Sequence, residues 1–183
     1  MSYYSIVERT AQRGLMESKR SRQDCDRWLA VWSLEIVCEA IEVKQAIFHD
    51  LPDKYLVELG DVIWGIAAVG LLTGIPEAEI FEGYADLVEE RFARSMAAEI
   101  LGTGKENALR LVDASGECSD YLKKVARDSR KIDRDVICLH LRRVVSVIRY
   151  LCDPLDALAA VDQKLRERFP DGYTPEASIN RVV

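Results

Sequence analysis

Two pairs of acidic residues in the first half of the chain have a spacing that suits metal chemistry. Glu39 and Glu42 are three residues apart, and Glu58 and Asp61 repeat that spacing further along. Residues at positions i and i+3 share one face of a helix. A single turn between two helices makes them antiparallel, so the four carboxylates are expected to face one another. Carboxylate oxygens are ligands that Mg²⁺ prefers, and Mn²⁺ accepts the same donors.

The acids lie among apolar residues, so we expect their shared face to be partly buried. Carboxylates crowded together in such a place repel one another and have raised pKa values, a conflict that a divalent cation resolves. The alternative is a solvated helix surface, which is the usual place of a single Glu-x-x-Glu pair. Gly60, between Glu58 and Asp61, favours the metal site, because a poor helix former there suggests close approach of another helix.

Other metal and nucleophile chemistry is not expected. A di-iron carboxylate bundle requires a histidine three residues after a glutamate, and neither His49 nor His140 has that spacing. The five cysteines form no Cys-x-x-Cys pair, and buried free thiols in a reducing compartment are the simplest interpretation.

Helical periodicity predicts an all-α protein, an antiparallel helical bundle. The expected helices cover residues 3–18, 23–49, 53–72, 76–100, 105–127, 133–151 and 154–168, followed by an irregular tail. Asp53 is expected to cap the third helix, and Pro76 suits the first turn of the fourth. The apolar run at residues 62–72 is interrupted by glycine and too short for a bilayer, which indicates a buried helix rather than a membrane span.

Gly102 and Gly104 mark a boundary between residues 1–101 and 105–183, and the pattern recurs beyond it. In an overlay of the two halves, Glu39 to Glu42 falls on Glu117 to Asp120. Likewise Glu58 to Asp61 falls on His140 to Arg143, so the second half lacks the second acidic pair. We interpret this as two diverged repeats forming an internal pseudo-dimer. The alternative is that any two helical hairpins look alike.

The acidic pattern resembles the MazG-like, all-alpha nucleoside triphosphate pyrophosphohydrolases over about residues 28 to 92. The carrying residues are Glu39-Ala-Ile-Glu42, Glu58-Leu-Gly-Asp61 and Leu71-Leu-Thr-Gly-Ile. The resemblance implies Mg²⁺-dependent cleavage of a nucleoside triphosphate to the monophosphate and pyrophosphate, a house-cleaning activity on the nucleotide pool. It implies a proton acceptor among the acids, for which Glu39 and Glu35 both qualify. Cys38 departs from the pattern, because many relatives carry a glutamate there.

The family often closes a repeat with a lysine followed by Arg-x-Pro, and only the second half keeps this, as Lys164-Leu-Arg-Glu-Arg168-Phe-Pro. Family members resemble dimers whose sites draw on both subunits. We therefore expect a monomeric pseudo-dimer or a homodimer, in which the second half supplies substrate contacts. The substrate candidates are Lys164, Arg168, Arg143 and Trp32. The alternative for Lys164 and Arg168 is a favourable interaction with the C-terminus of a helix. Arg143 could instead belong to a solvated basic face, and Trp32 could be a core aromatic residue.

The net charge of −6 argues against binding to nucleic-acid polymers or anionic membranes. No signal peptide is recognisable, so a cytoplasmic location is expected. Two other functions stay open: pyrophosphohydrolysis of another substrate such as phosphoribosyl-ATP, and a helical interaction module that has lost catalysis.

Overall fold

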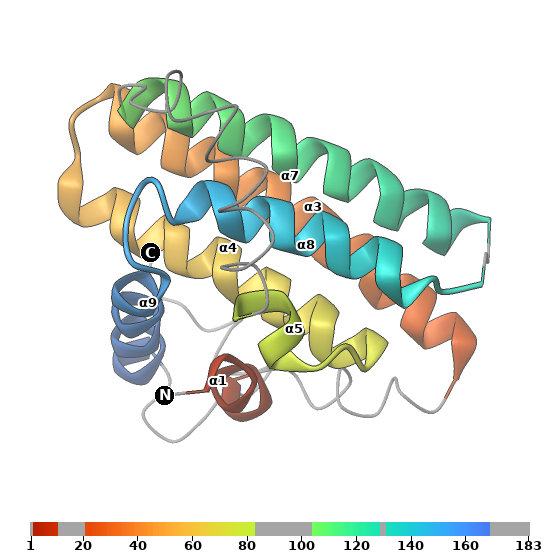
Figure 1. Ribbon diagram of the computed structural model, residues 1–183. Helices are drawn as coiled ribbons and strands as arrows, with labels where there is room; N and C mark the ends of the chain where they lie inside the picture. The colour runs from red at the N-terminus through yellow and green to blue at the C-terminus, as the bar shows by residue number, and fades with distance from the viewer. Residues whose placement is uncertain (1, 11–20, 83–103, 129–130, 169–183) are drawn as a thin grey trace.

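The computed structural model describes residues 2–10, 21–82, 104–128 and 131–168, and all regular structure in these ranges is helical (Figure 1). The helices are α1 (Tyr3–Thr10), α3 (Arg22–Phe48), α4 (Pro52–Thr73), α5 (Glu77–Phe81), α7 (Gly104–Arg127), α8 (Arg134–Ile148) and α9 (Pro154–Arg168). The predicted all-α class is confirmed. The expected continuations of helix to residues 18 and 100, and the irregular tail, lie outside the described residues.

The hairpin of α3 and α4 forms the frame of the acidic site. Ser21 caps α3, where its hydroxyl oxygen accepts a hydrogen bond from the Asp24 amide at 3.1 Å. The chain reverses after α3 through Asp50, which has a positive φ of 57°. Helix α4 then begins at Pro52, whose fixed φ suits a first helical position. The expectation that Asp53 caps this helix is therefore wrong, because the helix has already begun one residue earlier.

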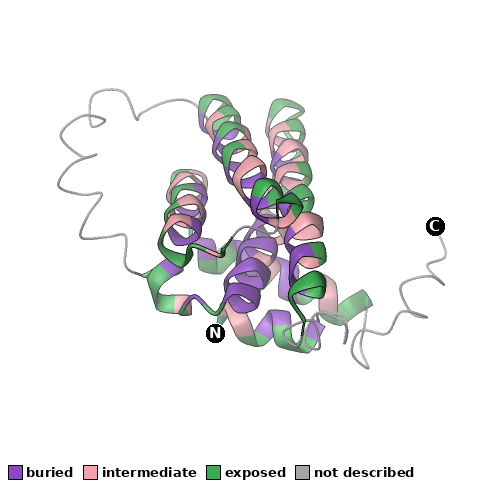
Figure 2. Ribbon diagram, turned by 90° about the vertical axis from the view of Figure 1, so that its right-hand side faces the viewer, coloured by how far each residue is buried: buried purple, intermediate pink, exposed green. Residues whose placement is uncertain are grey.

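Helix α4 is the central helix of the core, and nearly all its residues from Glu58 to Thr73 are buried. Figure 2 shows buried residues gathered where helices face one another and exposed residues on their outer sides. Among the described helices, α4 is long and apolar enough to cross a bilayer, but most of that stretch is buried against other helices. The expectation of a buried core helix fits this placement.

Helices α7 and α8 form a second hairpin, and α7 packs along α3 (Figure 1). Asp133 caps α8 by accepting a hydrogen bond from the Val136 amide at 3.2 Å. Each hairpin also packs against a helix from the other half of the chain: α5 lies against α8, and α9 lies against α4. Pro76 is the N-cap of α5, one residue before the position expected for it.

Gly60 marks the place where α9 approaches α4 most tightly. A Cβ atom on Gly60 would lie 2.4 Å from the carbonyl oxygen of Ala157 and 2.6 Å from the Cβ of Val161. The close helix approach expected from the sequence is confirmed, and the approaching helix is α9. Lys164 lies three residues beyond Val161, on the same side of α9, and so is directed toward the acids of α4.

Candidate metal centre

Three of the four predicted ligands converge between α3 and α4. Glu39 comes from α3, and Glu58 and Asp61 come from α4. One carboxylate oxygen of each lies within 4.8 Å of those of the other two. Glu58 is buried, whereas Glu39 and Asp61 are partly buried. Oxygen donors at this separation fit a hard divalent cation such as Mg²⁺ or Mn²⁺.

The charges of these acids are poorly balanced. Burial, followed by the negative charges of Asp61, Glu58 and Glu42, raises the pKa of Glu39 to about 8. Burial also raises the pKa of Glu58, although Lys164 opposes that shift. A bound cation would offset the repulsion among these carboxylates, so their crowding and raised pKa values favour a cation-binding site.

Glu42 lies at the edge of this group rather than within it. Its Oε2 is 3.4 Å from Nζ of Lys54, and the same Nζ is 3.7 Å from Oε1 of Glu58. The sequence alone predicts no role for Lys54 in the site. Its spacing of four residues from Glu58 was the one available signal, because such residues meet on a helix surface.

Glu35 lies one turn before Glu39 on α3 and is an exposed residue at the rim of the site. Loss of water around its carboxyl group, followed by the charge of Asp61, raises its pKa. Cys38, which stands where many members of the resembled family carry a glutamate, is an exposed free thiol. Of the two candidate proton acceptors, Glu39 is therefore inside the converging group and Glu35 is beside it.

Lys164 of α9 reaches the acidic site from the second half of the chain. Its Nζ donates a hydrogen bond to Oδ2 of Asp61, and the two side chains are 19% and 21% exposed. Arg168 is the exposed last residue of α9, and within the described part of the chain it forms no ion pair with the acids. The structure thus brings one of the two predicted cations of α9 to the site.

Arg143, another predicted substrate contact, is not near these acids. It pairs instead with Glu117 across α7 and α8, and both side chains are about half exposed. Asp120 of α7 is likewise paired with Lys124, at 2.5 Å. Of the residues that the overlay aligned with the predicted metal ligands, Glu117 and Arg143 therefore neutralise each other, and Asp120 is neutralised by Lys124.

Trp32 of α3 and Trp64 of α4 lie on the same helix faces as Glu39 and Asp61, further along each helix. Their ring centroids are 4.5 Å apart, and Trp28 stacks on Trp32 at 5.8 Å. Nε1 of Trp64 donates to the hydroxyl of Thr10 at 2.8 Å, whereas the buried Nε1 of Trp32 has no hydrogen-bond partner among the described residues. All three rings are half-buried and pack against the core, so they contribute to the packing of the fold.

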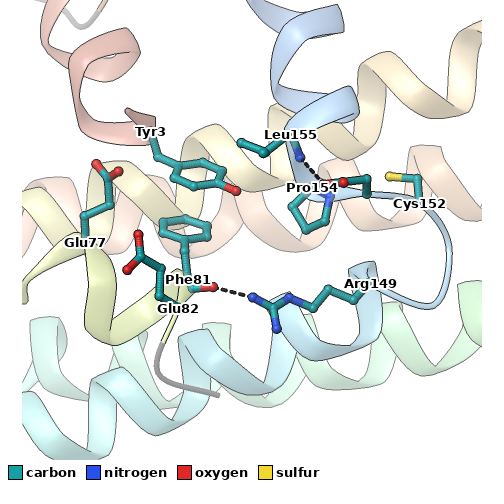
Figure 3. A pocket seen from close by; sticks show the side chains of 9 residues that line it. Tyr3, Glu77, Phe81, Glu82, Arg149, Cys152, Pro154 and Leu155 are labelled. Carbon is teal, nitrogen blue, oxygen red and sulfur yellow. Dashed lines mark hydrogen bonds between the residues drawn. The ribbon is translucent and has the colours of Figure 1, made fainter. Parts of the chain in front are cut away.

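A cavity of about 690 Å³ lies away from the acids, between α1, α5 and the start of α9 (Figure 3). Its wall includes Tyr3 stacked on Phe81, with ring centroids 3.8 Å apart. Arg149 donates a hydrogen bond to the Phe81 carbonyl and so ties α5 to α8. None of the residues predicted to bind metal or substrate lines this cavity.

No family model, no curated protein and no solved structure matches this chain.

Proposed function

We propose that this protein is a Mg²⁺-dependent hydrolase that converts a nucleoside triphosphate into the monophosphate and pyrophosphate, with Mn²⁺ as an effective substitute. The observation that carries the proposal is the convergence of Glu39, Glu58 and Asp61 within 4.8 Å. These three residues would hold the cation, and Glu42 is the neighbouring acid available to join them. The resemblance of the acidic motif to MazG-like enzymes supplies the substrate class and the reaction.

The bound cation would polarise the phosphate and lower the pKa of the attacking water. The water oxygen would form a bond to the α-phosphorus while the bond from that phosphorus to the bridging oxygen breaks, and pyrophosphate would leave with the bridging oxygen. The water proton must pass to a nearby base. Glu35 suits this role better than Glu39, because it borders the group of three without belonging to it, and Asp61 and lost hydration both raise its pKa.

Lys164 is the residue best placed to meet the triphosphate, since its ammonium group already contacts Asp61 of the acidic site. Arg168 is four residues further along α9, on the same side of the helix, and suits phosphate oxygens. Trp32 would contribute through the accessible part of its half-buried ring rather than through Nε1, which is buried. Aromatic packing of the base would use the same surface.

We further propose that the chain is a fused, diverged pair of repeats. Two observations support this: α3 and α7 pack along each other, and each hairpin packs against a helix from the opposite half. Lys164 reaching Asp61 from α9 is then the counterpart of one subunit contributing to the site of another. In this proposal one chain supplies groups from both repeats to the site, so it would act as a monomeric pseudo-dimer, and a homodimer is the alternative.

The test is to incubate the protein with Mg²⁺ and each nucleoside triphosphate in turn, and to identify the products by phosphorus NMR. The expected result is pyrophosphate and a nucleoside monophosphate as first products, lost in Asp61→Asn and retained in the matched control Asp120→Asn. Orthophosphate as the first product would reject the reaction. Turnover of phosphoribosyl-ATP alone would assign the second substrate class, and no turnover of either would favour a non-catalytic module.

A further inference from the structure

The contact between α9 and α4 is built so that one lysine sits directly on one metal ligand. Gly60 admits the backbone of α9 at Ala157 and the side chain of Val161. One turn further, Lys164 donates to Asp61, and each side chain is about four-fifths buried. The ammonium group of Lys164 therefore has few alternative positions in solvent. Its location is set by the packing of two helices.

Lys164 also acts on the wider group of acids. It opposes the upward pKa shifts of Glu39 and Glu58 as well as touching Asp61. Lys54 is the second cation of the site, but it is 48% exposed and its two carboxylate contacts are 3.4 and 3.7 Å. Exposed charges at such distances interact weakly because water and salt screen them. Lys164 is thus the principal fixed positive charge among these acids.

A divalent cation and the ammonium group of Lys164 would compete for the carboxylate of Asp61. Mg²⁺ binds carboxylate oxygens at short distances in a near-octahedral arrangement. An ammonium group hydrogen-bonded to the same carboxylate would lie within a few ångströms of the ion, where like charges repel. Binding of Mg²⁺ to Asp61 would therefore disfavour the position that Lys164 occupies in the metal-free site.

We propose that Lys164 is the resident cation of the metal-free site, and that Mg²⁺ binds by displacing it from Asp61. This inference rests on the proposed function, because it takes Glu39, Glu58 and Asp61 as the metal ligands. Displacement leaves the ammonium group at the edge of the site, where a triphosphate would arrive. Lys164 is then a positioning residue whose release is linked to metal binding.

The first test is calorimetric titration of Mg²⁺, and separately Mn²⁺, into the full chain without nucleotide. Lys164→Met removes the competitor and is expected to tighten metal binding by about fivefold or more, roughly 1 kcal/mol. Lys54→Met should tighten it less, because Lys54 is exposed. Lys124→Met is the matched control, since it removes the lysine of a carboxylate pair on α7, and should change nothing.

Unchanged or weaker metal binding in a folded Lys164→Met variant would overturn the inference and leave the proposed metal site standing. Absence of metal binding in the wild-type protein would reject the metal site, and with it the inference. If circular dichroism shows that Lys164→Met is unfolded, Lys164→Gln takes its place.

A second measurement follows the displacement itself. Acetylation of lysines by a water-soluble reagent, read by mass spectrometry, is expected to rise at Lys164 when Mg²⁺ is added, because the ammonium group leaves Asp61. Reactivity at Lys124 should stay constant. Protection of Lys164 that persists at saturating Mg²⁺ would contradict displacement.

Discussion

The two helical hairpins of this protein share an arrangement and differ in how they handle charge. In the α3–α4 hairpin, carboxylate faces carboxylate, and burial and mutual repulsion raise the pKa of Glu39 to about 8. In the α7–α8 hairpin, Glu117 faces Arg143. Asp120 on the same hairpin has a lowered pKa, chiefly because Lys124 donates a hydrogen bond to it. Acids on the two hairpins therefore have pKa values shifted in opposite directions, upward for Glu39 and downward for Asp120.

The difference shows that two hairpins with similar acidic residues can place them in different charge environments. In the α7–α8 hairpin the counter-charges of Glu117 and Asp120 come from the same two helices. Glu117 and Arg143 are about half exposed, and such pairs contribute little to stability. The α3–α4 acids are more buried, and the cation that contacts Asp61 comes from α9. The α3–α4 acids are the candidate metal site because Lys54, the cation that contacts them from their own hairpin, is exposed and lies 3.4 and 3.7 Å from its carboxylate partners.

The largest expected effect separates the hairpins by activity. Glu58→Gln and Asp61→Asn each remove a ligand oxygen's charge and should lower kcat/KM for the nucleoside triphosphate by about 100-fold or more, roughly 2.7 kcal/mol. Glu117→Gln and Asp120→Asn are the matched changes in the other hairpin, and each should keep kcat/KM within about twofold of the wild-type value. Equal losses from both hairpins, measured by steady-state pyrophosphate release, would erase the functional distinction.

The next effect uses one glycine from each hairpin. Gly60→Ala places a methyl group against Ala157 and Val161 of α9, and overpacking of this kind costs about 1–3 kcal/mol. Gly116→Ala on α7 meets nothing within 4 Å and should stabilise the helix by about 0.5–1 kcal/mol. Urea unfolding followed by circular dichroism measures both. A stabilising Gly60→Ala would mean that α9 does not pack tightly behind the acids.

A third effect sharpens the comparison through pH. Glu39, with a pKa of about 8 in the metal-free protein, must lose its proton to bind a cation. Metal affinity is expected to rise with pH, by about tenfold per unit below pH 8, and to level off above it. Calorimetry in buffers of different ionisation heat should record proton release. Affinity that is flat between pH 6 and 8 would show that Glu39 is not a ligand.

The smallest effect concerns the stability of the metal-free protein. Because the folded pKa of Glu39 is raised, the favourable neutral form contributes fully below the unfolded pKa near 4.5, and that contribution is lost as pH rises through about 8. Glu39→Gln should therefore melt a few degrees higher than wild type above pH 8 and no higher at pH 4. Glu117→Gln should not show this dependence. Thermal melts at both pH values, with chelator present, decide the matter.

The sequence predicts the part of this site that depends on local periodicity. The spacing of three residues places Glu58 and Asp61 on one face of α4, and the poor helix propensity of Gly60 correctly signals close packing. The same spacing does not say which oxygens converge, since residues three apart still differ in direction around the helix. Glu42 consequently lies beside Lys54, outside the group of three.

Long-range placement is what the sequence leaves undetermined. The overlay of the two halves aligns Arg143 with Asp61. It does not reveal that Arg143 pairs with Glu117 on the neighbouring helix. The sequence predicts that Lys164 contacts a substrate, and it does not reveal that Lys164 also contacts Asp61. Both outcomes depend on helix packing between distant segments, which periodicity within one segment does not encode.

The most direct test of the central claim is a titration of Mn²⁺ at pH 8, in which electron paramagnetic resonance reports the free ion. We expect the wild-type protein and Asp120→Asn to bind Mn²⁺ equally, Mg²⁺ to displace the bound Mn²⁺, and Asp61→Asn to bind Mn²⁺ at least tenfold more weakly. Equal binding by Asp61→Asn and Asp120→Asn, with both variants folded, would contradict a metal centre in the α3–α4 hairpin.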